Sequence, residues 1–281
     1  MEPSAALSVL PAGWGRSLGL LTELAVLWPA SRIEDRGDHL VIRTPGQPGY
    51  YWGNFLAFRD PPGPDAHRTW PRHFEAAFGH DPAIRHMTFA WDDPAGALGE
   101  LSALEAAGFA GELGVVLTAS RTSLPRPATP GLVVRPLESD ADWEAATLNQ
   151  VACRSDGFEL EAYTRFKRAR MATYREMARA GRGAWFGAFL DGTLVGELGL
   201  FTIGGVARYQ SVGTHPDYRR RGVCATLVHA AADHARAHWG VARLVIVAEP
   251  GEDAERVYRS VGFEPTERFA GLCRRPEAER A

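Results

Sequence analysis

A chain of 281 residues is long enough for two domains of ordinary size. Hydrophobic residues make up 45% and charged residues 23%, as in globular proteins, and the net charge of -3 gives no reason to expect nucleic acid or a membrane surface as a partner. The cysteines, Cys153, Cys224 and Cys273, are odd in number, which argues against a disulfide framework and for a cytoplasmic protein.

The first helix is expected at residues 18–28, an apolar segment that is too short to span a bilayer and contains Glu23. The residues before it have neither the basic start nor the small-residue cleavage site of a signal peptide. Apolar periodicity then predicts strands at 40–43, 50–58, 85–91 and 115–119, and helices at 70–78 and 95–107.

A proline-rich segment, residues 122–131, follows these elements. Its prolines block both a helix and a strand ladder, and little in it could be buried. We therefore predict one domain at 1–124, a linker at 125–131 and a second domain at 132–281.

The second domain is predicted to start with a strand at 132–135. A helix then begins at a capping box, Ser139-Asp140-Ala141-Asp142, and runs to about Val151. Residues 184–190 and 193–201 form a hairpin, because Asp191-Gly192 is a favoured two-residue turn. The other predicted elements are helix 161–179, strand 206–214, a helix ending near Gly240, strand 243–248, helix 252–260 and strand 269–273. This alternation predicts an α/β layer fold.

The two halves share a local pattern. Leu104-Glu105-Ala106-Ala107-Gly108-Phe109 and Tyr258-Arg259-Ser260-Val261-Gly262-Phe263 each read as a helix end, a C-terminal glycine and a phenylalanine, preceded by an apolar strand. We interpret this as a diverged internal duplication.

The run from Thr214 to Leu227 lies between a predicted strand and a predicted helix, and it contains Arg219, Arg220, Arg221 and Gly222. Backbone N–H groups at such a turn, the partial positive charge of a helix N-terminus and the arginines together favour an anion. Glycine lets the backbone approach a ligand that a Cβ would block. The run is therefore a candidate phosphate site.

Two motifs extend this observation to a family. Tyr218-Arg219-Arg220-Arg221-Gly222-Val223-Cys224 resembles the acyl-CoA pyrophosphate loop of the GNAT acetyltransferases, Gln/Arg-x-x-Gly-x-Gly/Ala, and departs from it at Cys224. Ala254-Glu255-Arg256-Val257-Tyr258, followed by Gly262-Phe263, resembles the family's second motif, with Gly251 where asparagine is common. The resemblance covers about residues 132–274.

The resemblance implies two tandem GNAT-like domains, each with a mixed, mostly antiparallel central sheet flanked by helices, and acetyl-CoA as co-substrate. It implies that Tyr258 protonates the departing thiolate, which is feasible because a tyrosine has a pKa of ~10 and a thiol ~8.5. The end of the strand would pair with the pantetheine amides and the turn would hold the diphosphate. The implied acyl-CoA-binding residues are Val212, Gly213, Thr214, Arg219, Arg220, Arg221, Gly222, Val223, Cys224, Ala225 and Thr226.

The general base is a separate question. In some relatives a glutamate on a central strand takes the proton from the amine, directly or through water, and Glu197 is the candidate here, although the strand pattern does not say which face it uses. Gln210 and His215 are weaker candidates. His234 and His238 have helical i, i+4 spacing but no third ligand at a recognisable spacing, so no metal is expected.

Two further features could border an acceptor. Phe158, Tyr163 and Tyr174 are candidate acceptor contacts, since the family's first two helices commonly border that site. The basic run 165–170, which holds Lys167, the single lysine of the chain, is either an anion-binding face or a solvated helix surface. The predominance of arginine is typical of a GC-rich, bacterial genome.

The first half is predicted to be degenerate. Its loop at 59–65 contains three prolines, which donate no N–H, and two aspartates, which repel phosphate, and Leu104 stands where Tyr258 stands in the second half. The aromatic segment 50–55 either packs in the core, which we favour, or contacts the second half.

The sequence therefore predicts an acyl-CoA-dependent N-acyltransferase with its site in the second half, acting on a small-molecule amine or a protein amine. Two other classes fit parts of the pattern. One is a non-catalytic acyl-CoA-binding regulatory or scaffold protein, which the departures at Cys224 and Gly251 would allow. The other is a tandem aminoacyltransferase that uses aminoacyl-tRNA, against which the net charge of -3 argues.

Overall fold

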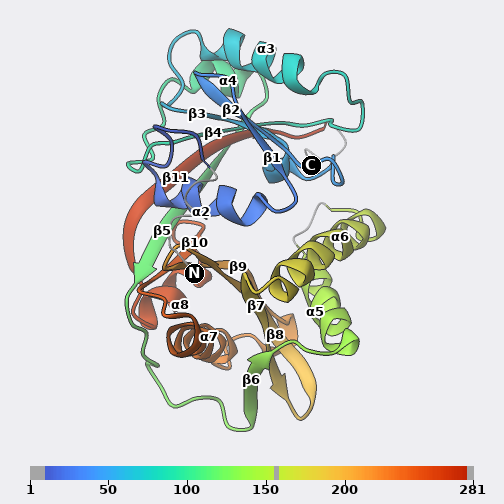
Figure 1. Cartoon of the computed structure of the whole chain (residues 1–281), viewed down its shortest axis with the longest axis vertical. Coiled ribbons are helices and arrows are strands. Elements are labelled where there is room, and N and C mark those ends of the chain that lie inside the picture. Colours follow the sequence, from blue (N-terminus) through green and yellow to red (C-terminus); the bar gives the residue numbers. More distant parts are fainter. Residues whose placement is uncertain (1–9, 155–157, 277–281) are drawn as a thin grey trace. The chain divides into compact units, whose positions relative to one another are not determined.

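The computed structural model describes residues 10–154 and 158–276, which fold into two compact units (Figure 1). The C-terminal unit comprises Leu117–Thr266. Of the described residues, the N-terminal unit comprises 10–116 together with 267–276. Both boundaries fall inside strands, so the units do not coincide with the predicted domains 1–124 and 132–281.

The N-terminal unit is built on a mixed sheet in the order β1-β2-β3-β4-β11. Its first three strands are antiparallel, β3 and β4 are parallel, and β11 is antiparallel to β4. Its strands are β1 Arg32–Asp35, β2 His39–Arg43, β3 Phe55–Phe58, β4 Met87–Trp91 and the part of β11 (Glu264–Arg274) from Glu267, with part of β5 (Ala110–Ala119). Its helices are α2 Leu18–Leu27, α3 Ala66–Phe78 and α4 Ser102–Ala106, with a 3-10 turn η1 at Tyr51–Gly53.

The C-terminal unit has the strand order β10-β9-β8-β7-β6. Strands β6 to β9 are antiparallel to their neighbours, and β9 and β10 are parallel. The strands are β6 Leu132–Pro136, β7 Gly183–Leu190, β8 Thr193–Ile203, β9 Val206–Thr214 and β10 Arg243–Ala248. The helices are α5 Asp140–Ala152, α6 Leu160–Arg179, α7 Val223–Trp239 and α8 Asp253–Ser260, with a 3-10 turn η2 at Pro216–Tyr218.

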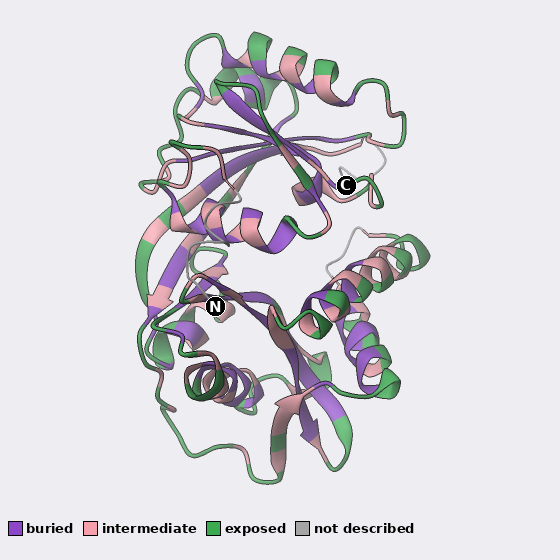
Figure 2. Ribbon diagram, in the orientation of Figure 1, coloured by how far each residue is buried: buried purple, intermediate pink, exposed green. Residues whose placement is uncertain are grey.

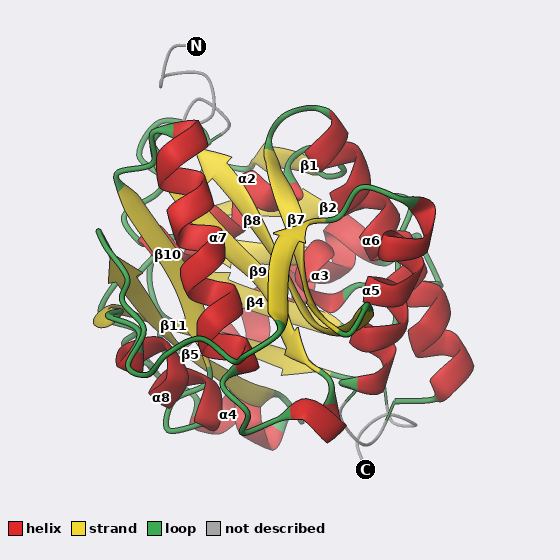
Figure 3. Cartoon of the chain, turned by 90° about the horizontal axis from the view of Figure 1, so that it is seen from below, coloured by secondary structure: helices red, strands yellow, loops and turns green. Residues whose placement is uncertain are grey.

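Helices cover both faces of this second sheet. Figures 1 and 3 show α7 over one face, while α5 and α6 lie over the other in Figure 1. Neighbouring residues of β8 mark the two faces, because a Cβ on Gly196 would contact Val223 of α7, whereas Glu197 bonds to residues of α5. The strands between are largely buried (Figure 2).

The predicted duplication is visible in how two helices end. Gly108 and Gly262 both have positive φ, +86° and +103°. The N–H of the next residue bonds back to the helix in the same way, Phe109 to the Leu104 carbonyl and Phe263 to the Tyr258 carbonyl, both at 3.1 Å. In both units a run of antiparallel strands ends in a parallel pair, β1 to β3 followed by β4 in the first and β6 to β9 followed by β10 in the second. The local pattern therefore does mark a repeated unit.

Three local predictions were wrong. The helix expected at 95–107 is reduced to α4, since Gly96 and Gly99 adopt positive φ of +61° and +63° and leave 95–101 irregular. The strand expected at 50–58 begins only at Phe55, after the η1 turn. Strand β1 was missed, because it is short and carries three charged residues, Arg32, Glu34 and Asp35.

The proline-rich segment is irregular, as expected, but it belongs to the C-terminal unit. The Ser123 N–H donates to the Val261 carbonyl at 3.0 Å, and Thr122 Oγ1 lies 2.8 Å from His229 Nδ1. The Thr129 hydroxyl donates to the Arg221 carbonyl at 2.7 Å. These contacts hold the segment against the C-terminal unit, and Thr129 places its end next to the basic turn.

No helix of the described residues is long and apolar enough to cross a membrane. Cys153, Cys224 and Cys273 are free thiols.

The C-terminal strand of the chain supplies core side chains to the N-terminal unit. Leu272 is fully buried there, in a cluster with Phe89 and Phe109. Leu272→Ala should lower the free energy of unfolding by about 2–5 kcal/mol, because it removes buried apolar groups and leaves a cavity. Leu113→Ala, at a half-exposed position of the same unit, should cost under about 1 kcal/mol. Urea unfolding of the full chain measures both, and equal costs would contradict the role of β11 in this core.

Candidate active site

Strands β9 and β10 are paired only where they begin. The parallel ladder joins Val206–Arg208 to Arg243–Val245, and then β9 continues to Thr214 and β10 to Ala248. The ends of the two strands therefore extend past their ladder toward the start of α7. An extended ligand with amide groups could add to β9 at this point in the manner of another strand.

Strand β9 also carries a bulge in this stretch. Its register against β8 shifts between Glu197 and Gly199, so that Ser211 and Val212 oppose the single residue Leu198. Ser211 has a φ of +48°, which few non-glycine residues adopt. The amide of Gln150 donates to the Ser211 carbonyl at 2.8 Å. A bulge changes the direction of the backbone, so the end of β9 does not continue the regular pairing of the sheet.

The basic turn after β9 brings together the residues that the loop motif predicts. Arg220 and Gly222 both have positive φ, +61° and +80°. Gly222 is the N-cap residue of α7, and no side chain caps this helix. By contrast, Ser139 and Asp142 cap α5 reciprocally. The first N–H groups of α7 are therefore left for an external acceptor, which is the arrangement that binds anions.

The side chains of the turn divide into two groups. Arg219, Arg220 and Arg221 are exposed, and Arg219 Nε donates to the Thr214 carbonyl at 3.3 Å. Val223 is buried beneath the first turn of α7, so it can offer only its backbone N–H to a ligand. Thr226 is buried too, and its N–H and hydroxyl both donate to the Gly222 carbonyl, at 3.1 Å and 3.0 Å, so the expectation that its N–H binds the ligand was wrong. Burial raises the pKa of the Cys224 thiol to about 12, which keeps it protonated and unreactive.

Glu197 lies on β8, the strand next to β9, and its side chain is on the face that α5 covers. Its carboxylate is fully buried and accepts hydrogen bonds from Asn149 Nδ2, Gln150 Nε2 and Trp185 Nε1. Burial raises its pKa to about 7, and these hydrogen bonds act in the opposite direction. A Cβ on Gly213 would lie 2.5 Å from Oε1, so glycine at that position makes room for the carboxylate.

The only lysine of the chain lies in the same cluster. Lys167 Nζ donates to Gln150 Oε1 at 2.7 Å, and the amide nitrogen of the same glutamine donates to Glu197. Burial lowers the pKa of Lys167, while the charge of Glu197 raises it. Arg165 and Arg168 are exposed and paired with Glu161 and Glu144. The basic run is therefore a solvated surface except at Lys167 and at Arg170, which is buried against Tyr174.

Unpartnered polar atoms collect around Cys153. Asn149 Oδ1, Arg154 Nε and Thr214 Oγ1 are buried without a hydrogen-bond partner. Asn149 and Thr214 lie beside Cys153, because its thiol donates to the Thr214 carbonyl at 3.3 Å and a Cβ on Gly213 would contact both Asn149 Nδ2 and Cys153 Sγ. Buried polar groups are normally satisfied, so this side of Gly213 is suited to a polar ligand.

Tyr258 is buried on α8, and Phe263 packs beside it. Burial raises its pKa well above the usual value, so the phenol stays protonated and can act only as a donor near neutral pH. Helix α8 contacts α7, and the rings of Tyr258 and Tyr209 both lie beside Phe263.

The other candidates lie in less suitable places. Gln210 is buried in β9, and His215 Nδ1 accepts from the Asp217 N–H at 3.4 Å, where it caps η2. His234 and His238 stack on each other at 4.1 Å on α7. Among the acceptor candidates, the rings of Phe158 and Tyr163 lie 5.4 Å apart. Burial raises the pKa of Tyr163, with smaller effects from Cys153, Arg154 and Glu197. Tyr174 packs against Trp185 at 4.7 Å, inside the core.

Sequence reasoning missed Asn149, Gln150, Cys153 and Trp185, since their roles depend on which face of β8 carries Glu197. One signal in the sequence could have pointed to this cluster. Lys167 is the only lysine in a chain rich in arginine, and such a lone lysine indicates a position where the two residues are not interchangeable.

In the N-terminal unit, the equivalent parallel strands β3 and β4 do not extend beyond their ladder. Its parallel ladder runs to the ends of both strands, Phe58 pairing with Trp91, and the next N–H, that of Asp92, donates to the Phe58 carbonyl. The buried Asp92 carboxylate in turn accepts from the N–H groups of Gly15, Arg16 and Ser17. The aromatic segment packs within its own unit, as favoured, with Trp52 against Phe55 and Phe269.

Residues 151–263 match the model of the acetyltransferase (GNAT) family. The C-terminal unit carries a GNAT domain. The match includes the end of β9 that extends beyond its ladder with β10, the basic turn, Tyr258 and Glu197. No curated protein matches the sequence significantly.

The fold is shared with solved structures over most of the chain. A GCN5-related N-acetyltransferase from Kribbella flavida is 17% identical with a TM-score of 0.63, covering 92% of this chain and 96% of its own. A tandem GNAT protein from the clavulanic acid biosynthesis pathway is 16% identical with a TM-score of 0.54, covering 97% and 96%. A conserved protein of unknown function from Staphylococcus epidermidis is 12% identical with a TM-score of 0.68, covering 86% and 92%. The predicted fold of two tandem GNAT-like domains is confirmed.

Proposed function

We propose that this protein is an acyl-CoA-dependent N-acyltransferase that uses acetyl-CoA, with its active site in the C-terminal unit. One observation carries the proposal: β9 and β10 extend beyond their ladder in front of a helix whose N-terminus has no side-chain cap. A GNAT domain needs both features, a place for an extended pantetheine and N–H groups for a diphosphate.

Acetyl-CoA would supply an activated acetyl group as a thioester. The backbone of Val212, Gly213 and Thr214 would pair with the pantetheine arm. The turn from Arg219 to Gly222 and the N–H groups of Val223, Cys224 and Ala225 would hold the diphosphate, with the exposed arginines adding attraction. Tyr258 would donate a proton to the departing sulfur, and no residue would carry the acetyl group.

The acceptor amine would approach from the side of α5 and α6. Glu197 would take its proton, and because this carboxylate is fully buried the transfer would pass through water. The unpartnered atoms of Asn149, Arg154 and Thr214 would then contact the acceptor or that water. The N-terminal unit, whose strands stay paired to their ends, would not bind CoA in this manner.

Removing the hydroxyl of Tyr258 tests the proposed acid. Tyr258→Phe should lower kcat by about 100-fold, as loss of a general acid does, and leave the KM for acetyl-CoA nearly unchanged. Tyr209→Phe is the matched control, since that buried hydroxyl donates to the Val228 carbonyl and should not affect turnover. Steady-state kinetics of free-thiol release measure both, and equal rates for the two variants would rule out the acid role.

The function itself is tested by two measurements on the full chain. Calorimetric titration with acetyl-CoA should show one site, and thiol release over a panel of primary amines should show turnover with at least one. Binding without turnover would favour a regulatory or scaffold role. Binding of tRNA at moderate salt without binding of acetyl-CoA would favour the aminoacyltransferase.

A further inference from the structure

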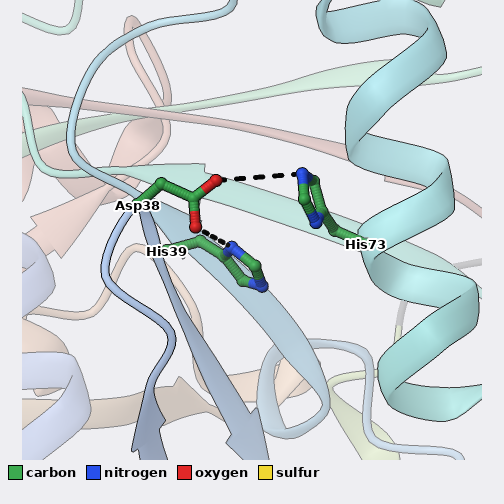
Figure 4. Close-up of side chains that lie close together, drawn as sticks. All are labelled: Asp38, His39 and His73. Carbon is green, nitrogen blue, oxygen red and sulfur yellow. Dashed lines mark hydrogen bonds and ion pairs between the residues drawn. The ribbon is translucent and has the colours of Figure 1, made fainter.

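Three side chains with metal-binding atoms lie together in the N-terminal unit, remote in sequence from the GNAT domain. Asp38 precedes β2, His39 is the first residue of β2, and His73 lies on α3 (Figure 4). Asp38 Oδ1 lies 2.7 Å from His39 Nδ1, and Asp38 Oδ2 lies 3.8 Å from His73 Nε2. One ligand atom from each residue lies within 4.8 Å of the other two.

Packing holds the two imidazoles in place. The His39 ring lies 4.6 Å from the His73 ring and 5.4 Å from Phe58, measured between centroids. The His39 side chain is 7% exposed, His73 is 39% exposed and Asp38 is 64% exposed. One edge of the cluster is therefore fixed in the unit and the other is open to solvent.

The ligand atoms of these three residues favour one class of metal ion. Two imidazole nitrogens and one carboxylate suit zinc and related divalent transition metals, whereas magnesium and calcium prefer oxygen ligands. Ligand bonds of about 2.0–2.2 Å to a tetrahedral ion put neighbouring ligand atoms roughly 3.4 Å apart. The distances of 2.7 Å and 3.8 Å from the Asp38 carboxylate lie on either side of that value, so side-chain rotations alone would bring the three atoms around an ion.

The surrounding charges permit a cation. The nearest basic residue of the same turn, Arg36, is paired with Glu34 at 2.9 Å. With three protein ligands, an ion would keep a position for water on the exposed side of Asp38.

We propose that Asp38, His39 and His73 form a binding site for a divalent transition-metal ion of the zinc class. The ion would join the turn before β2 to the middle of α3. It would thus hold a helix of the N-terminal unit on its sheet. The proposal is independent of the acyltransferase activity, because all three ligands belong to the unit whose parallel strands stay paired to their ends.

The test is a titration of the full-length protein, prepared without a histidine tag and freed of metal with a chelator. Zn²⁺ should bind at one site, and His73→Ala and Asp38→Asn should weaken that site by about tenfold or more. Mg²⁺ should not compete. His80→Ala, an exposed histidine just after α3, is the matched control and should bind like the unchanged protein.

Two further readouts keep the result interpretable. Zn²⁺ should raise the unfolding temperature of the unchanged protein and of His80→Ala, but not that of His73→Ala. Co²⁺ should give the absorption of a nitrogen–oxygen site without thiolate bands. A site that survives in His73→Ala, that is lost instead in His234→Ala, or that shows thiolate bands would overturn the proposal, as would the absence of any Zn²⁺ binding.

Discussion

Replacing Gly222 with valine should weaken the binding of acetyl-CoA by about 100-fold, equivalent to about 2.7 kcal/mol. Gly222 has a φ of +80°, where a β-branched residue is strained by about 1–3 kcal/mol. A Cβ there would also lie 3.2 Å from the Thr129 hydroxyl, which holds the neighbouring Arg221 carbonyl. Relief of this strain would turn the N–H groups at the start of α7 away from the diphosphate, and each such hydrogen bond to a charged group is worth about 1.5–3 kcal/mol.

A matched control separates loss of the site from loss of folding. Gly192 has a φ of +78° in the hairpin between β7 and β8, and a Cβ there would meet nothing within 4 Å. Gly192→Val should therefore impose a similar backbone strain while leaving the affinity for acetyl-CoA intact. Calorimetric titration gives both dissociation constants. If Gly222→Val binds as tightly as Gly192→Val, the turn does not hold the co-substrate.

Local features of the site were predictable from the sequence because they depend on a few adjacent residues. A glycine between an arginine run and an apolar helix requires a positive φ and leaves the helix without a cap, and Gly222 has both properties. Gly262 and Phe263 likewise end α8 in the expected way. Such patterns need no knowledge of how distant segments pack.

Features that depend on long-range packing were not predictable. An alternating strand pattern places Glu197 on one face of β8 but does not say which helix covers that face. The donors Asn149 and Gln150 come from a helix and lie 48 and 47 residues before Glu197 in the chain. The same reason explains why strand 269–273 was expected in the second domain, since the apolar pattern around Leu272 does not say which unit it belongs to.

The two units differ in how far their strands extend beyond the parallel ladder. Strand β3 has four residues and ends at Phe58, and the prolines at 61 and 62 follow soon after. Strand β9 has nine residues, of which the ladder to β10 uses the first three. Strand length beyond the parallel ladder, more than any single side chain, therefore separates the unit with a candidate site from the unit without one.

Glu197→Gln should lower kcat by about 100-fold or more above pH 7, because an amide cannot accept the proton of the amine. All three hydrogen-bond partners of Glu197 donate, which suits the ionised form, while burial raises its pKa to about 7. The rate of the unchanged protein should thus increase as the pH passes through about 7 and the carboxylate forms. The variant should lose this increase. Thermal unfolding of both proteins shows whether the variant is folded, and a folded variant with normal turnover would exclude Glu197 as the base.

Lys167 offers a sharper test, because it changes the pKa of the base without removing it. The positive charge of Lys167 lowers the pKa of Glu197, so Lys167→Met should raise that pKa further and move the increase in kcat/KM to higher pH. Arg168→Met is the control, since this neighbour is exposed and paired with Glu144. Comparing pH profiles with the same amine cancels the titration of the acceptor itself. A profile that does not move, or that moves to lower pH, would mean that the group titrating near neutral pH is not Glu197.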